Sequence, residues 1–289
     1  MKKLFSILLA GLMVVSLAAC SDKDETDDDL DAYVQEEIIV DNYTNEKGQT
    51  FYFDSLDSES VTITGYEGSD VPHAVEIPSE ILGKKVAAIK DSAFYGLSNI
   101  TAVTVPDTVT SIGSYAFACC SQLESIVIPA NVEVIEDGAF FRCSGLKSLT
   151  FEAGSKMTAI PECAFKECSS LESLTVPGNI KTIGVGAFHD CVSLKTIVIE
   201  EGVEVIGNQA FQNCKALESL TLPASITKIE SKEIVTEDGK VVEENFNFRG
   251  CDALYIEGVT LPANQNCVAA KYIASLELQH KPADPEVAA

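Results

Sequence analysis

Apolar and polar residues recur along the middle of the chain with a period of about 23 residues. An Ala-Phe pair marks each period, and the intervals between successive phenylalanines are 23, 23, 25, 23 and 23 residues. These phenylalanines are Phe94, Phe117, Phe140, Phe165, Phe188 and Phe211. A unit of this length cannot bury an apolar face by itself, so neighbouring units must stack. The period therefore predicts a solenoid.

Each period also contains a short segment in which apolar and polar residues alternate, as in Ile126-Val-Ile128. Such alternation is typical of a strand with one buried face. Proline often follows, because proline lacks the N–H that a strand ladder would need next. Equivalent strands of successive units would pair in parallel at ~4.8 Å. The segments between Val75 and Leu261 predict about eight short parallel strands.

The complete unit resembles the BspA-like leucine-rich repeats of bacterial surface proteins. One copy places apolar or proline residues at Leu123, Ile126, Ile128, Pro129, Val132 and Ile135, followed by Ala139, Phe140 and Cys143. The resemblance covers roughly residues 61–262. It implies an α/β fold, a leucine-rich-repeat solenoid with rungs of about 23 residues. Members of this family are associated with attachment to host matrix proteins and to other cells, so the resemblance also implies a binding role.

Departures from the repeat predict its ends and irregularities. Residues 49–78 should form an N-terminal β cap and the first strand, with a hairpin over 50–64. Residues 79–262 should form the solenoid, in which 152–156 bulge outward and 230–247 add a hairpin turning at Asp238-Gly239. Residues 263–289 should form a C-terminal cap, with a short helix and strand over 267–278, and a loose tail.

The first 19 residues have the pattern of an export signal. Lys2 and Lys3 are basic, and the 16 residues from Leu4 to Ala19 are uncharged, fewer than the ~20 that a membrane span needs. The run ends at Cys20 in a sequence that resembles the lipobox of bacterial lipoproteins. This resemblance implies that residues 1–19 are removed and that Cys20 is acylated. The alternative is an ordinary cleaved signal followed by an unrelated cysteine.

Residues 20–48 begin with an acidic run and should form a solvated tether. An acidic patch after a lipidated cysteine resembles the surface-export signal of some Gram-negative lipoproteins. It implies a protein anchored in the outer membrane and facing outward. The formal net charge of −24 makes nucleic acid and anionic lipid head groups improbable partners.

Ten cysteines in an exported chain suggest disulfides, but their spacing favours another interpretation. Six occupy one repeat position, where the first unit carries Leu97, and a site that accepts leucine is buried and apolar. The six are Cys120, Cys143, Cys168, Cys191, Cys214 and Cys251. We expect a column of buried thiols and no metal site, since no histidine joins them. Disulfides among Cys119, Cys163 and Cys267 stay open.

The outward positions of the expected strands form a candidate binding face rich in hydroxyl groups. Its residues are Ser125, Val127, Ser148, Thr150, Ser173, Thr175, Thr196, Val198, Ser219 and Thr221. Beside it runs a column of alternating charge, made of Glu124, Lys147, Glu172, Lys195 and Glu218. Because alternating charges cancel each other's field, we interpret the column as a structural ladder rather than as a ligand track.

Motifs for catalysis or for cofactor binding are absent from the sequence, so we expect neither an enzyme nor a cofactor. The family resemblance implies adhesin-like binding of host or microbial surface proteins, and the lipobox resemblance implies that the membrane is contacted through the lipid on Cys20. The alternative is a glycan-capturing lipoprotein of a nutrient-uptake system. A glycan ligand is disfavoured because the chain has no Trp and its tyrosines form no repeated column.

Overall fold

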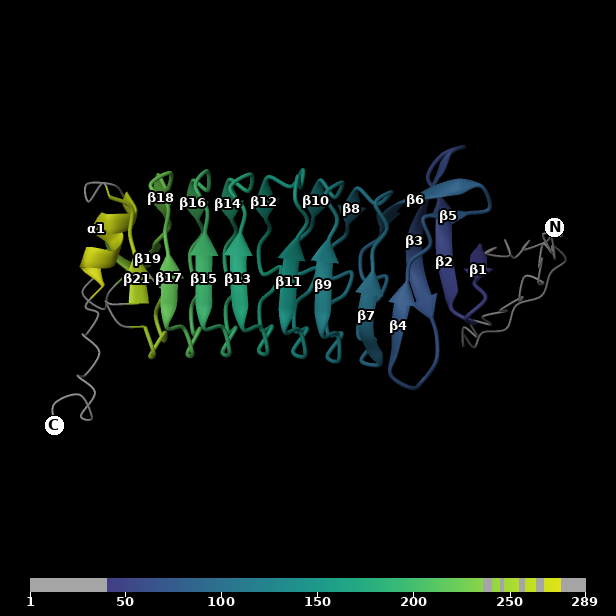
Figure 1. The fold of residues 1–289 in the computed structure, drawn as a ribbon, viewed down its shortest axis with the longest axis horizontal. Helices are drawn as coiled ribbons and strands as arrows, with labels where there is room; N and C mark the ends of the chain where they lie inside the picture. The colour runs from purple at the N-terminus through teal and green to yellow at the C-terminus, as the bar shows by residue number, and fades with distance from the viewer. Residues whose placement is uncertain (1–40, 236–240, 245–246, 255–257, 264–267, 277–289) are drawn as a thin grey trace, which may run out of the picture.

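The computed structural model describes residues 41–235, 241–244, 247–254, 258–263 and 268–276. The expected signal, the lipidated Cys20, most of the tether, the turn at Asp238-Gly239, Cys267 and the C-terminal tail lie outside these residues. The described chain forms an elongated stack of rungs, with the N-terminal strands at one end and a helix at the other (Figure 1).

One side of the stack, the strand face, consists of the eight expected parallel strands in two sheets. The first sheet has the order β11-β9-β7-β4 and the second has the order β13-β15-β17-β21. The strands are β4 (His73–Glu76), β7 (Ile100–Thr104), β9 (Ser125–Ile128), β11 (Ser148–Phe151), β13 (Ser173–Val176), β15 (Thr196–Ile199), β17 (Ser219–Thr221) and β21 (Val259–Thr260). The solenoid of parallel strands predicted from the 23-residue period is confirmed.

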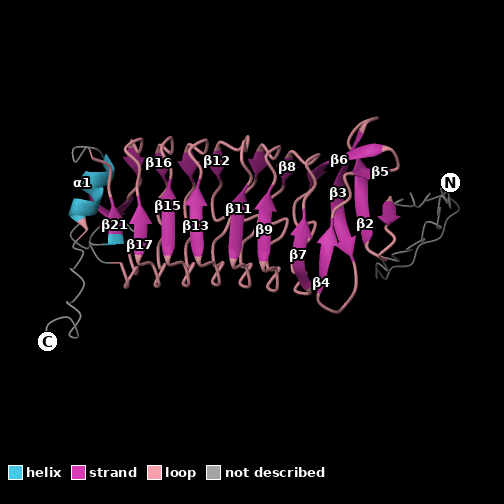
Figure 2. Ribbon diagram, in the orientation of Figure 1, coloured by secondary structure: helices cyan, strands magenta, loops and turns pink. Residues whose placement is uncertain are grey.

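A second row of shorter parallel strands lies on the opposite side of the stack (Figure 2). It comprises β6 (Lys84–Ile89), β8 (Ser111–Ile112), β10 (Val134–Ile135), β12 (Ala159–Ile160), β14 (Thr182–Ile183), β16 (Val205–Ile206) and β18 (Lys228–Ile229). Each rung therefore runs from a strand-face strand to a second-row strand. It then returns through the turn that carries the repeated phenylalanine, the Phe turn.

The 25-residue unit interrupts the ladders on both sides of the stack. Pairing stops between β11 and β13 on the strand face and between β10 and β12 in the second row. The two extra residues fall in the expected bulge, where Glu152 and Gly154 are exposed while Ser155 and Met157 are buried. Asn179 holds this segment, because its Nδ2 donates hydrogen bonds to the carbonyls of Ser155 and Met157.

Columns of identical side chains fill the core between the two rows of strands. Seven phenylalanine rings, from Phe94 to Phe248, stack with centroids 4.8–5.6 Å apart and with interplanar angles of 4–14°. The rings lie in parallel because successive rungs have the same backbone geometry. The stack of rings continues across the 25-residue unit, since the ring centroids of Phe140 and Phe165 are 5.2 Å apart. The aromatic column therefore joins the two halves of the solenoid where the ladders do not.

Caps of different structure cover the two ends. At the front, β1 (Asn42–Thr44), β2 (Thr50–Ser55) and β3 (Ser60–Glu67) pair antiparallel, and β5 (Glu80–Ile81) pairs with β6. The predicted N-terminal hairpin is therefore confirmed. At the back, α1 (Val268–Ser275) buries Ala269, Tyr272 and Ile273 against the last rung. Within the described residues α1 is the only helix, so the α component of the fold is confined to this cap.

The insertion after β18 forms the predicted hairpin. Its strands β19 (Lys232–Val235) and β20 (Val241–Glu244) pair antiparallel. The base of the insertion is fixed by Asn247, which is fully buried. Its Nδ2 donates a hydrogen bond to the Glu230 carbonyl, and its Oδ1 accepts one from the Ala210 N–H. The insertion follows β18 of the second row, and the chain rejoins the repeat at Phe248.

Candidate functional site

The structure places all ten candidate binding residues on the strand face. Each occupies an outward position of β9, β11, β13, β15 or β17, while the residues between them point into the core. The six candidates on β9, β11 and β13 are exposed, and the four on β15 and β17 are half-buried. The period-2 alternation therefore placed these side chains correctly, and their role in binding stays a prediction.

Parallel pairing arranges these side chains in two columns along the stack. Ser125 pairs with Ser148 in the first sheet, and Thr175 pairs with Val198 in the second. The hydrogen-bonded ladder beneath these columns stops between β11 and β13. Val127 and Val198 are the two large apolar side chains of the set, and 51% of Val127 is exposed. The face is thus lined mainly by short hydroxyl side chains on a rigid backbone.

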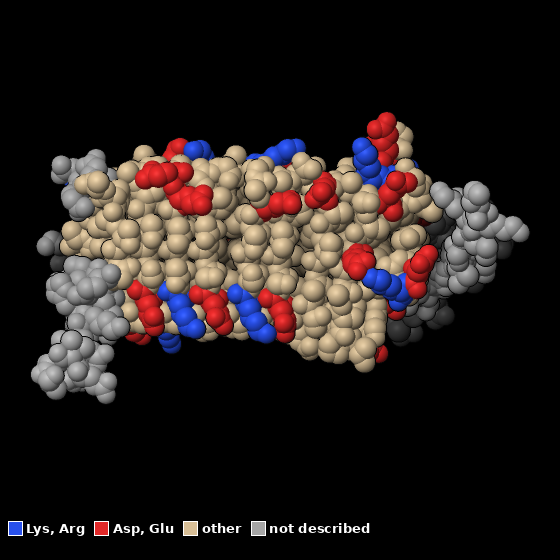
Figure 3. Space-filling model, viewed as in Figure 1, with Lys and Arg blue, Asp and Glu red and all other residues tan. Residues whose placement is uncertain are grey.

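The alternating charges beside this face form ion pairs between neighbouring rungs, as the ladder interpretation predicted. Lys147 Nζ lies 3.2 Å from Glu124 Oε1, and Lys195 Nζ lies 3.8 Å from Glu172 Oε2. The side chains are 57–62% exposed, so each pair contributes less than about 1 kcal/mol. Figure 3 shows this row as alternating red and blue along one edge of the uncharged strand face. The opposite charges within each pair offset each other locally.

The cysteine column is buried, as its spacing predicted. All eight described cysteines are free, and the six column members are at most 8% exposed. Each column thiol donates a hydrogen bond to the carbonyl of a phenylalanine of the preceding rung, over 3.1–3.5 Å. Cysteine thus fills a small apolar site and also satisfies a buried carbonyl, which leucine at position 97 does not do. Cys119 and Cys163 are half-buried.

Burial also changes the acidity of these thiols, because it penalises the charged thiolate. It raises the pKa of Cys120 to about 12, and it also raises the pKa values of Cys143, Cys168 and Cys191 well above the ordinary thiol range. For Cys214 a hydrogen bond with Cys251 raises the pKa most, and burial raises it too. Burial therefore favours the protonated form of these five thiols.

Two features of the described residues bear on chemistry. No group of three or more His, Cys, Asp and Glu side chains converges there as a metal ion would require. The described part of the chain also has no helix long and apolar enough to cross a membrane.

Sequence reasoning missed the geometry of the Phe turns. The second residue after each phenylalanine has a positive φ, from Gly96 in the first unit to Gly250 in the last. Between them the position is held by Cys119, Arg142, Glu167, Asp190 and Asn213. Gly96 and Gly250 were the sequence signal for a positive φ at this position, because glycine tolerates that conformation best. The turns bring these side chains into one row along an edge of the stack.

The parallel strand rows, the repeated turn and the stacked core columns define a leucine-rich-repeat solenoid. Six copies of the BspA type leucine rich repeat region match the chain over residues 73–156 and 150–235. The chain therefore belongs to the BspA type leucine-rich-repeat family. No curated protein matches it significantly.

Solved bacterial structures share this architecture. A leucine-rich cell surface protein from Faecalibacterium prausnitzii A2-165 is 29% identical, with a TM-score of 0.60 over 78% of this chain and 55% of its own. A leucine-rich-repeat protein of T. pallidum is 27% identical, with a TM-score of 0.63, and the match covers 80% of this chain and 95% of the T. pallidum chain. A leucine-rich-repeat protein from Eubacterium ventriosum ATCC 27560 is 27% identical, with a TM-score of 0.58, and the match covers 73% of this chain and 50% of the E. ventriosum chain. The chain thus spans about half the length of two of these three proteins.

Proposed function

We propose that this protein is a non-enzymatic, lipid-anchored surface protein that binds protein partners through its strand face. The observation that carries the proposal is a flat sheet surface with uncharged, mostly hydroxyl-bearing side chains on a rigid scaffold. Family membership and the description of the F. prausnitzii protein as a cell surface protein support it.

The dimensions of the face favour a protein ligand. Eight strands at ~4.8 Å extend about 34 Å, and a four-residue strand is ~13 Å long, giving roughly 450 Å². A standard protein interface covers about 800 Å² on each partner. A partner must therefore also cover the charged row that contains Glu124 and Lys147. An uncharged centre with a charged rim is the usual anatomy of a protein interface.

The side chains of the face disfavour a sugar ligand there. None of its ten residues is aromatic, and sugar rings usually pack on exposed aromatic rings. The exposed tyrosines Tyr95 and Tyr115 belong to the Phe turns and not to these strands. The 230–247 insertion is a second candidate contact surface, since long insertions on regular scaffolds often carry recognition.

A binding screen tests the strand face. The purified full chain is passed over immobilised matrix proteins, and saturable binding is expected for at least one. Replacing Thr150, Thr175 and Thr221 by Glu should weaken that binding at least ~30-fold, because unpaired charges buried in an interface cost about 2 kcal/mol or more. A matched control places the same charges near the second row, as Thr110→Glu, Thr158→Glu and Thr227→Glu.

The possible results distinguish binding at the strand face from binding at the second row or at the 230–247 insertion. Loss of binding in the strand-face variant alone supports the proposal. Equal loss in both variants, or binding that disappears only when 230–247 is deleted, rejects the strand face as the contact surface.

Lipid anchoring requires its own experiment. With two or more acyl chains on Cys20, the protein should fractionate with membranes, and whole cells should expose it to added protease. Cys20→Ala should release it into the soluble fraction. A Cys20→Ala protein that still fractionates with membranes would exclude anchoring through this residue.

A further inference from the structure

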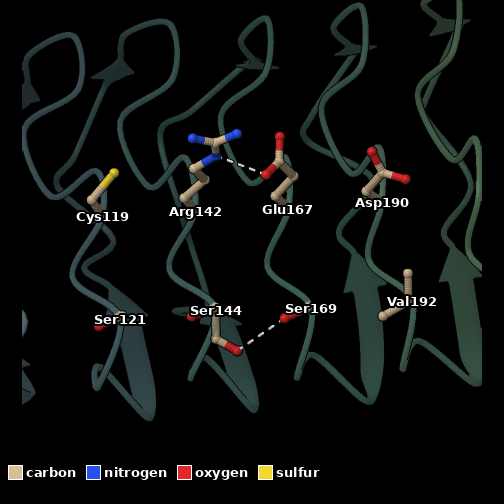
Figure 4. A pocket seen from close by; sticks show the side chains of 8 residues that line it. All are labelled: Cys119, Ser121, Arg142, Ser144, Glu167, Ser169, Asp190 and Val192. Carbon is tan, nitrogen blue, oxygen red and sulfur yellow. Dashed lines mark hydrogen bonds and ion pairs between the residues drawn. The ribbon is translucent and has the colours of Figure 1, made fainter.

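A groove of about 520 Å³ runs along the Phe turns of four successive rungs (Figure 4). One wall is formed by the residues with positive φ, which stand two positions after the phenylalanine of each turn. The other wall is formed by the residues four positions after that phenylalanine. The lining residues are Cys119, Ser121, Arg142, Ser144, Glu167, Ser169, Asp190 and Val192. The volume lies within the range of small-molecule sites, about 300–1,000 Å³.

The backbone fixes the first wall of this groove. Arg142, Glu167 and Asp190 have φ values of 59–62°. Their N–H groups donate hydrogen bonds to the carbonyls of the next rung, over 2.8–2.9 Å. Residues other than glycine adopt this conformation at a cost of about 1 kcal/mol each, and the end rungs use Gly96 and Gly250 instead. The middle rungs thus carry long polar side chains where the fold itself favours glycine.

Arg142 is the one guanidinium in this groove, and it is held in place from two sides. Its Nε donates a hydrogen bond to Glu167 Oε2 over 2.7 Å, and its Cζ lies 5.0 Å from the centroid of the Phe141 ring. One Nη nitrogen lies on the side of Glu167 and the other lies on the opposite side. Among the described residues no acceptor is hydrogen-bonded to them. The guanidinium therefore presents a fixed pair of donors to a ligand.

Exposed aromatic rings continue the surface at the N-terminal end of the groove. Tyr95 is 55% exposed and precedes Gly96, which holds the same turn position in its rung as Cys119 holds in the next. Tyr115 is 44% exposed and packs edge-on against Phe141, with ring centroids 6.3 Å apart. Tyrosine combines an apolar ring with a polar tip, so these residues offer a stacking surface beside the polar groove.

The charged and polar side chains of the groove, together with the neighbouring tyrosines, indicate which class of ligand it can bind. Arg142 and Glu167 neutralise each other, while Asp190 and the chain charge of −24 repel anions. A purely apolar ligand would desolvate these polar groups without pairing them. A neutral sugar has hydroxyls that donate and accept, and C–H faces that stack on rings. We infer that the groove centred on Arg142 binds a short neutral glycan.

A glycan array tests the inference with the purified full chain. The array carries neutral gluco-, galacto-, manno- and N-acetylhexosamine oligosaccharides, together with uronic acid and sialic acid oligosaccharides. Saturable binding to a neutral oligosaccharide is expected, and titration calorimetry then measures its affinity. Arg142→Gln and Tyr95→Ala should each weaken it at least tenfold. Lys147→Gln makes the same change of charge beside the strand face and should leave the affinity unchanged.

The result also separates this site from the strand face. The triple Glu variant at Thr150, Thr175 and Thr221 should keep full affinity for the glycan. Absence of neutral glycan binding, binding of acidic glycans alone, or equal weakening by Arg142→Gln and Lys147→Gln would overturn the inference. Thermal unfolding of each variant provides the folding control. Arg142 is exposed, so the midpoint of Arg142→Gln should stay close to that of the native chain.

Discussion

The buried thiol column makes the stability of the solenoid depend on alkaline pH. Five column cysteines have pKa values raised above the ordinary range, namely Cys120, Cys143, Cys168, Cys191 and Cys214. Below about pH 8 these thiols are protonated in both the folded and the unfolded chain. Above that pH the unfolded thiols ionise, with a pKa of about 8.5, while the folded ones stay protonated. Ionisation then stabilises only the unfolded chain.

The size of the effect follows from proton linkage. Each such thiol lowers the free energy of unfolding by about 1.4 kcal/mol per pH unit between its unfolded and folded pKa values. Five thiols together lower it by about 7 kcal/mol per unit, or roughly 9 kcal/mol between pH 8 and pH 10. This is comparable to the whole stability of an ordinary domain, about 5–15 kcal/mol. We therefore expect the solenoid to unfold near pH 10, well below the folded pKa of Cys120.

Urea unfolding measures this dependence. Circular dichroism at pH 7, 8, 9 and 10, under a reductant, gives the free energy of unfolding by linear extrapolation. Replacing Cys143, Cys168 and Cys191 by Ala removes three of the five titrating groups. The loss of stability above pH 9 should then fall from about 7 to about 3 kcal/mol per pH unit. Cys119→Ala, outside the column, should leave the dependence unchanged. Parallel pH curves for the triple variant and the native chain would refute the reasoning.

Three further predictions use urea unfolding at pH 7. Phe165→Ala should lower the free energy of unfolding by about 4 kcal/mol, and Phe248→Ala by less, because Phe248 stacks in parallel on one ring only. Equal losses would contradict this. Asn179→Ala should cost about 1–2 kcal/mol by freeing two carbonyls of the bulge, and no change would exclude that role. A double-mutant cycle on Lys147 and Glu124 should give a coupling below about 1 kcal/mol that disappears in 1 M salt, whereas a salt-independent coupling would contradict a surface pair.

The repeat predicted the strand face well because its signal is local and periodic. Every unit places apolar residues at alternate positions, as in Ile126 and Ile128, and that spacing alone determines which side chains are buried. The cysteine column was predictable for a similar reason, since one unit has Leu97 at the equivalent site. Stacking of identical rungs then turns a local pattern into a column.

Shorter and less regular features were not predictable in the same way. Apart from β6, the second-row strands, such as Val134–Ile135, are two residues long and provide no alternation to detect. The residues at the groove prefer a right-handed conformation as single residues, and hydrogen bonds from their N–H groups to the next rung hold them in the left-handed one. The bulge at 152–156 was visible as two extra residues, but the interruption of both ladders needed the three-dimensional register.

The two proposed sites differ in how they use the repeat, and removal of one rung separates them. The strand face repeats in every rung, so a partner that follows it should lose affinity as the stack is shortened. The groove depends on residues that occur once, from Cys119 to Val192. Deleting residues 194–216 joins Ser193 to Leu217 and keeps all columns in register. The shortened chain should stay folded, because each rung contacts only its neighbours. It should bind matrix protein more weakly and keep most of its affinity for neutral glycan, because the deletion removes partners of Asp190 at the end of the groove but leaves the Arg142–Glu167 pair intact. If both affinities fell together, the two ligands would share one surface, and the assignment of separate sites to the strand face and the Phe turns would be wrong.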